Sequence, residues 1–262
     1  MAVIIGEVAV LGNVPPFYEM VAGFLVSFFL TTSSMAMNDY VDLEIDMINQ
    51  PSRPLPSGAI PKQVALYLAG LTGFLGILAA VPFDWGATAL AIVTFAMSTL
   101  YNLYGKRTGF WGNLMVSYCV AVPFLFGGIM VMQKVNATSL TFFLLAFLAN
   151  AGREVTKGIA DMEGDRVRAI KTVALVRGAR SAAFLSALLY LIPAAISPLP
   201  YVSGQLGNAY LALIIPVDLG FVYSSYLITK NYEQSTALRV KTQVRYWMLL
   251  GLLAFFFGGL LR

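Results

Sequence analysis

The feature that most constrains the fold is a series of apolar runs, each close to the length of a membrane-spanning helix. A helix needs about 20 apolar residues to cross the hydrocarbon core of a bilayer, whereas transmembrane β-strands show shorter segments of alternating polarity. Charged residues make up 11% of the chain, against roughly 25% in an average soluble domain. The sequence therefore predicts an all-α polytopic membrane protein with a single domain.

Nine apolar segments can be placed along the chain, and the first is about half of a spanning length. We therefore expect a bundle of nine transmembrane helices in which the first helix is incomplete. The segments cover residues 1–12, 17–38, 62–81, 86–104, 111–132, 138–158, 180–197, 207–229 and 243–261. The connections 39–61 and 159–179 are longer than the others and are rich in charge.

Lysine and arginine residues collect in or near the connections that follow even-numbered segments, whereas Lys134 and Arg262 fall on the other side. Cytoplasmic loops of membrane proteins are enriched in these residues. The even-to-odd connections are therefore expected in the cytoplasm and the C-terminus outside the cell membrane. Loop cations also account for the net charge of +4, so no nucleic-acid surface is expected. The cytoplasmic set comprises Arg53, Lys62, Lys106, Arg107, Arg166, Arg168, Lys171, Arg177, Arg180, Lys230, Arg239, Lys241 and Arg245.

An acidic stretch leaves the second segment without a break. On a helix, Asn38, Asp42 and Asp46 are four residues apart and share one face, with Asp39 at its edge. Carboxylate and amide oxygens suit hard divalent cations such as Mg²⁺. The chain contains no histidine, so histidine-containing zinc sites and an imidazole base are excluded. The stretch is therefore a candidate magnesium site.

A second acidic tail follows the sixth segment at the same side of the membrane. Arg153, Lys157, Asp161 and Asp165 are four residues apart in series, so two cations and two carboxylates share a helical face. Solvated helix ends are the simpler explanation for a single acid, but two such tails are better explained by a shared ligand. Because Mg²⁺ retains several waters and binds substrate phosphates, the pair of tails predicts a magnesium-diphosphate site.

These motifs resemble two signatures of the UbiA superfamily of intramembrane prenyltransferases. The tract Arg53-Pro54-Leu55-Pro56-Ser57-Gly58 and the pairing of Tyr101 with Lys106 resemble two further landmarks of that superfamily. The resemblance implies a central substrate cavity, cytoplasmic active-site loops at about 39–61 and 159–179, a polyprenyl diphosphate donor bound through Mg²⁺, and a lipophilic acceptor. The implied metal ligands are Asn38, Asp39, Asp42, Asp46, Asp161 and Asp165; the implied diphosphate contacts are Arg53, Tyr101, Lys106, Arg153, Lys157 and Lys171; and the implied catalytic residues are Asp42, Asp161 and Lys106.

Within the superfamily, the residues around the second tail resemble an archaeal branch that transfers a geranylgeranyl group to geranylgeranylglyceryl phosphate. An aromatic acceptor of quinone biosynthesis is the alternative within the same superfamily. An ion-coupled transporter is a third interpretation, although transporters bind ions near the bilayer midplane and these acids lie at one face. Asp218 lies deep in the eighth segment and is assigned no role in the site.

Overall fold

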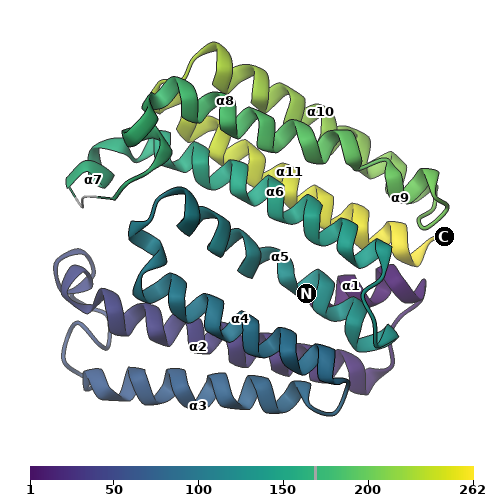
Figure 1. Cartoon of the computed structure of the whole chain (residues 1–262), viewed down its shortest axis with the longest axis horizontal. Coiled ribbons are helices and arrows are strands. Elements are labelled where there is room, and N and C mark those ends of the chain that lie inside the picture. The colour runs from purple at the N-terminus through teal and green to yellow at the C-terminus, as the bar shows by residue number, and fades with distance from the viewer. Residues whose placement is uncertain (168–169) are drawn as a thin grey trace.

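The computed structural model describes residues 1–167 and 170–262, and this part of the chain is helical with no strand (Figure 1). Arg168, one of the expected cytoplasmic cations, lies outside the described residues. The all-α class is therefore confirmed. The elements are α1 (Ala2–Leu11), α2 (Phe17–Asn49), α3 (Lys62–Ala80), α4 (Trp85–Leu103), the 3-10 helix η1 (Gly105–Arg107), α5 (Phe110–Met132), α6 (Ala137–Ala160), α7 (Met162–Val167), α8 (Val173–Ile196), α9 (Leu199–Val202), α10 (Asn208–Lys230) and α11 (Gln234–Leu260).

Seven helices in the described ranges are long and apolar enough to cross a membrane, namely α2, α3, α4, α5, α8 continued by α9, α10 and α11. α1 is shorter, at 10 residues. α6 has 24 residues but carries Asn150, Arg153 and Glu154 along its length. Its buried position among other helices shields these polar groups from lipid, which explains how a less apolar helix fits in this bundle.

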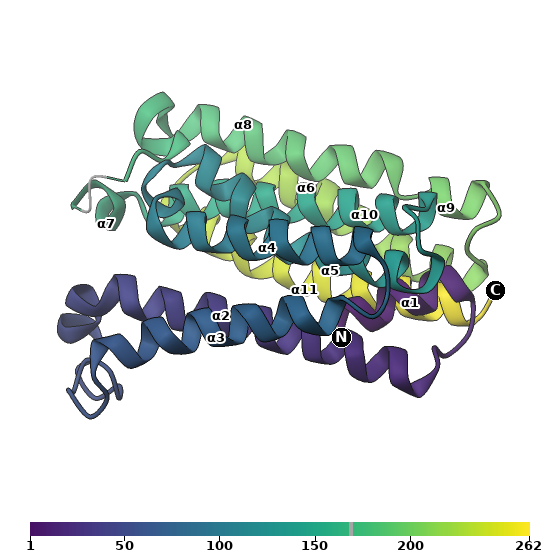
Figure 2. The ribbon, with the colours of Figure 1, turned by 60° about the horizontal axis from the view of Figure 1, so that its bottom comes forward.

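The helices pack in two groups around α5 and α6 (Figures 1 and 2). α2, α3 and α4 contact one another. α8 and α11 pack against α6, and α10 packs against α8 and α11. α5 contacts both α4 and α6, and α1 packs against α5 and α11, so these two helices join the groups. α7, the loop after α2 and the turn between α4 and α5 gather at one end, opposite α9 and the C-terminus (Figure 1). We call it the polar end.

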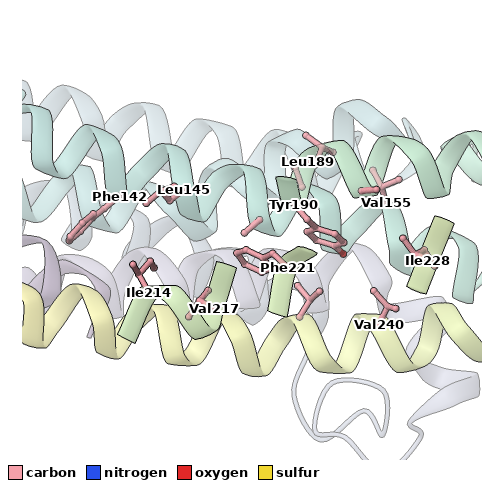
Figure 3. Close-up of a cluster of buried hydrophobic side chains, with 14 of the residues drawn as sticks. Phe142, Leu145, Val155, Leu189, Tyr190, Ile214, Val217, Phe221, Ile228 and Val240 are labelled. Atoms are coloured by element: carbon pink, nitrogen blue, oxygen red, sulfur yellow. The ribbon is translucent and has the colours of Figure 1, made fainter. Parts of the chain in front are cut away.

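Buried aromatic rings hold α6, α8, α10 and α11 together (Figure 3). Phe142 stacks on Phe255 with ring centres 3.8 Å apart, and Tyr190 stacks on Phe221 at 5.8 Å. The hydroxyl groups of Tyr190 and Thr156 share a hydrogen bond of 2.7 Å. Because lipid is as apolar as these side chains, close packing and interhelical hydrogen bonds stabilise such contacts.

Three helices extend beyond their apolar runs. α2 continues to Asn49, so the acidic stretch is helical and the irregular connection is restricted to residues 50–61. α8 begins at Val173 and is interrupted at Gly178, whose φ of 82° lies in the left-handed region. α11 begins at Gln234, nine residues before the expected boundary of 243. The added turns of α2 and α11 carry many polar residues, which apolar periodicity does not mark as helical. The added turn of α8 is mostly apolar, but Gly178 separates it from the rest of that helix.

Gly220 on α10 offers a test of this packing, because a Cβ there would overlap the indole ring of Trp247 on α11. We expect Gly220→Ala to lower the apparent midpoint of thermal unfolding in detergent, since overpacking typically costs about 1–3 kcal/mol. Gly70→Ala on α3 is the matched control, because nothing lies within 4 Å of a Cβ at that position. Equal midpoints for the two variants at the same heating rate would contradict the close approach of α10 to α11.

Candidate active site

The acids of α2 are paired with cations from two later segments. Lys106 Nζ lies 2.6 Å from Asp42 Oδ2, and both side chains are about three-quarters buried. Arg53 Nη1 lies 3.4 Å from Asp39 and 3.2 Å from Asp46, so one guanidinium joins two carboxylates. The acidic face therefore carries compensating positive charge along its whole length.

The position of Lys106 follows from the end of α4 and the 3-10 turn after it. The side-chain amide of Asn102 donates to the carbonyl oxygens of Ser34 and Ser98, which fixes α4 against α2. Asn38 Nδ2 in turn donates to Asn102 Oδ1 over 3.3 Å, so the amide oxygen of Asn38 is left available as a ligand. The tight turn of η1 then directs Lys106 back towards α2.

A cavity of about 590 Å³ opens at the polar end, and we call it the polar cavity. Residues from α4, η1, α6, α7 and the start of α11 line it. Because Lys106 lines this cavity and also contacts Asp42, it connects the first acidic tail with the second. The charged and aromatic lining residues include Tyr101, Lys106, Glu154, Lys157, Asp161 and Asp165.

The second acidic tail begins where α6 ends. Asp161 is the C-cap residue of α6, and its carboxylate lies 3.6 Å from Lys241 Nζ on α11. The backbone N–H of Asp165 donates to the carbonyl oxygen of Asp161, which keeps both acids within one turn. Gln234 Nε2 donates to the carbonyl oxygen of Ala160 over 2.9 Å. The start of α11 is therefore bonded to the end of α6 beside the cavity.

One turn of α6 carries three charged residues with different surroundings. Glu154 accepts a hydrogen bond from Arg153 Nη1 at 2.9 Å and lies 3.5 Å from Lys157 Nζ. Glu154 and Lys157 line the polar cavity, whereas Arg153 lines a separate apolar cavity. The carboxylate of Glu154 thus shields two like charges from each other.

The oxygen donors fit a hard divalent cation by type. α2 supplies three carboxylates and the amide oxygen of Asn38, and the second tail supplies Asp161 and Asp165. Across the described ranges, no group of three or more acidic, cysteine or histidine side chains lies close enough to hold a metal by itself. A metal bound here would therefore need ligands from substrate or water as well, as is usual for Mg²⁺ in phosphate sites.

The expected site residues divide into two sets. Tyr101, Lys106, Lys157, Asp161 and Asp165 line one cavity, and Asp42 contacts its Lys106. The remaining expected residues do not line that cavity; they are Asn38, Asp39, Asp46, Arg53, Arg153 and Lys171. The exposed Lys171 presents its carbonyl group to Gly109, where φ is +64° and a Cβ would overlap it.

Four further residues of the site carried weaker sequence signals. Glu154 is an acid within the sixth expected segment, and its position between Arg153 and Lys157 could have identified it. Asn102, Gln234 and Lys241 act through contacts between distant segments, which residue spacing along the chain does not reveal.

Comparison with known proteins identifies the family. The model of the UbiA prenyltransferase family matches residues 1–258. The chain belongs to the UbiA prenyltransferase family. A digeranylgeranylglyceryl phosphate synthase of Thermococcus kodakarensis is 34% identical to this family member over 259 residues, covering 99% of this chain and 92% of the relative.

Solved structures of the family share the fold. A structure described as a digeranylgeranylglyceryl phosphate synthase in membranes superposes with a TM-score of 0.92 at 30% identity, covering 100% of this chain and 92% of that one. A UbiA homolog from Archaeoglobus fulgidus, solved with DMAPP and Mg²⁺, superposes with a TM-score of 0.66 at 16% identity, covering 97% and 95%. The more distant likeness concerns the fold alone, and both support the membrane bundle of this UbiA family member.

Lys106 and Arg107 are adjacent cations with different surroundings, and their comparison tests the site. Lys106 contacts Asp42 and lines the polar cavity, whereas the side chain of Arg107 is exposed. We expect Lys106→Gln to lower the rate of prenyl transfer about 100-fold or more, because a positioned charge is lost. Arg107→Gln is expected to remain close to wild type. Equal losses in a labelled-donor assay would indicate that general loop charge, rather than a specific contact, matters.

Proposed function

We propose that this protein transfers a geranylgeranyl group from its diphosphate to geranylgeranylglyceryl phosphate in a Mg²⁺-dependent reaction of archaeal ether-lipid synthesis. The proposal is carried by the position of Lys106. This residue contacts Asp42 on the acidic face of α2 and also lines the cavity that Asp161 and Asp165 line. The name of the Thermococcus relative, digeranylgeranylglyceryl phosphate synthase, supports this choice of reaction.

The donor diphosphate would bind where the polar cavity meets the acidic face of α2, beside the pair of Lys106 with Asp42. Its oxygens would complete the ligand set of Mg²⁺ held by Asn38, Asp39, Asp42 and Asp46 of α2 and by Asp161 and Asp165 of the second tail. The donor types support this assignment, and the Archaeoglobus homolog of the same fold binds DMAPP together with Mg²⁺. Bound Mg²⁺ supplies neutralisation of negative charge on the diphosphate.

The cations of the cavity wall contribute to breaking the bond between C1 of the donor and the diphosphate oxygen. Lys106 and Lys157 would stabilise the diphosphate as negative charge develops on that oxygen. Tyr101 would offer an aromatic face to the allylic cation. The acceptor hydroxyl oxygen then bonds to C1, and its proton passes to the diphosphate. Arg53 and Lys171 would contact the diphosphate only from the neighbouring loops, since neither lines the cavity.

The proposal also includes the orientation of the helix bundle in the membrane. We assign α1, α2, α3, α4, α5, α6, α8, α10 and α11 as nine membrane helices around the substrate cavities, with the polar end in the cytoplasm and the C-terminus outside. The concentration of lysine and arginine near the polar end supports this orientation. An aromatic acceptor is the competing choice within the family, and product analysis separates it from the proposal. Membership of the UbiA prenyltransferase family argues against ion-coupled transport.

The reaction is tested with purified protein, Mg²⁺ and labelled geranylgeranyl diphosphate, offered either geranylgeranylglyceryl phosphate or an aromatic quinone precursor. We expect diphosphate release and an ether product with the first acceptor, and loss of both with a chelator. Asp42→Asn and Asp161→Asn are expected to lose nearly all activity because each removes a ligand charge, whereas Glu44→Gln, an exposed acid on α2, should not. Aromatic product alone, or uptake into liposomes without chemistry, would refute the proposed reaction.

The orientation is tested by cysteine labelling in a Cys119→Ser background, because Cys119 is the single cysteine of the chain. Ser57 lies in the loop after α2 and Ser203 follows α9, and both are exposed. With an impermeant maleimide applied to intact cells, we expect Ser203→Cys to react and Ser57→Cys to react only after lysis. The reverse pattern would show that the bundle has the opposite orientation.

A further inference from the structure

A second cavity, of about 330 Å³, lies between α5, α6, α8, α10 and α11, and we call it the apolar cavity. Most of its lining residues are aliphatic or aromatic. Leu145 of α6 and Ile214, Val217 and Phe221 of α10 belong to them (Figure 3). Such a lining suits a hydrocarbon chain rather than a diphosphate.

Two arginines nevertheless line this cavity. Arg245 is an exposed residue of α11, so it lies at the cavity mouth, and its guanidinium is 5.8 Å from the ring centre of Tyr246. Arg245 has no ion-pair partner within residues 1–167 and 170–262. Arg153 is paired through Nη1 with Glu154, but its buried Nε has no hydrogen-bond partner in the same ranges. An arginine without an ion-pair partner on a membrane helix is costly and usually functional, and Arg245 is such a residue.

The charges are arranged in order along the cavity. α10 and α11 run antiparallel, with Gly220 packed against Trp247 and Gly251 beside Val217. Asp218 therefore lies beside the turn of α11 that follows Arg245. Along the bundle, Asp218 is further from the polar end than Arg245 is. Its Oδ2 accepts a hydrogen bond of 2.6 Å from Ser197. An anionic group in this cavity is thus attracted to the arginine end and repelled from the Asp218 end.

We propose that Arg245, together with Arg153, binds the phosphate of the lipid acceptor, while the acceptor chain occupies the apolar cavity. The inference rests on the proposed function and adds the residue that selects a phosphorylated acceptor. Arginine suits this role because its planar guanidinium donates two parallel hydrogen bonds to one phosphate.

The adjacency of the two cavities supports the assignment to acceptor rather than donor. The donor diphosphate has its own cations, Lys106 and Lys157, in the polar cavity. Arg153 and Glu154 are consecutive residues, yet the first lines the apolar cavity and the second lines the polar cavity. A phosphate at Arg153 would therefore hold the neighbouring hydroxyl group of the acceptor close to the donor site.

The test compares acceptor kinetics of Arg245→Gln and wild type, using geranylgeranylglyceryl phosphate and its dephosphorylated alcohol. Loss of a charge-assisted contact predicts an acceptor KM raised about 10-fold to 100-fold for the phosphate. The donor KM should be unchanged, and the two proteins should use the alcohol equally well. Arg239→Gln is the matched control, because Arg239 is an exposed arginine of α11 that lines neither cavity.

Other outcomes distinguish failure of the role of Arg245 from failure of the proposed reaction. An unchanged KM for the phosphorylated acceptor, or an equal increase for phosphate and alcohol, would overturn the role of Arg245 while leaving the proposed reaction intact. Absence of transfer to either acceptor by wild-type protein would instead overturn the proposed function. An unchanged donor KM shows that the variant is folded, so a selective loss with the phosphate cannot be attributed to misfolding.

Discussion

The cost of placing charge in hydrocarbon determines where this bundle can carry chemistry. An ionised side chain at the centre of a membrane helix costs roughly 2.5–3.5 kcal/mol on insertion scales. α2 meets this constraint by its length: 33 residues make a helix of about 50 Å, against a hydrocarbon core of about 30 Å. Its last turns therefore extend beyond the core, and these turns carry the acidic stripe from Asn38 to Asp46.

The acidic side chains of this stripe are held by ion pairs of different strength. Arg53 and Asp39 are about half exposed, so their pair contributes about 0–1 kcal/mol. The pair of Lys106 with Asp42 is shorter and less exposed, and the turn of η1 after α4 positions its lysine. Because the pair of Arg53 with Asp39 contributes so little, these two residues can bind other ions without loss of the fold.

Most helix positions could be predicted from the sequence because the bilayer imposes a length on apolar runs. The expected segments 62–81, 86–104 and 111–132 differ from α3, α4 and α5 by one residue at most at either end. The start of α11 could not be predicted in the same way. Residues 234–242 are mostly polar, although Ala237 and Val240 are buried at helical spacing.

The site was predictable in its residue types but not in its pairings. Acids four apart on one face identify a ligand stripe, because helical periodicity is local. The contacts of Lys106 with Asp42 and of Lys241 with Asp161 join residues 64 and 80 positions apart, so they depend on how the helices pack. Arg153, an expected diphosphate contact, lines the apolar cavity and not the polar cavity, and residue spacing along the chain does not distinguish the two.

The central position of α6 explains how one turn can serve two cavities. Successive residues of a helix point about 100° apart, since there are about 3.6 residues in a turn. Arg153 and Glu154 therefore face different directions, and Lys157 returns to the side of Glu154. α6 contacts α5 on one side and α8 and α11 on others, so Arg153 and Glu154 are both flanked by neighbouring helices. Asn150, Arg153 and Glu154 make α6 less apolar than its neighbours. α6 can carry them because neighbouring helices, rather than lipid, surround this part of it.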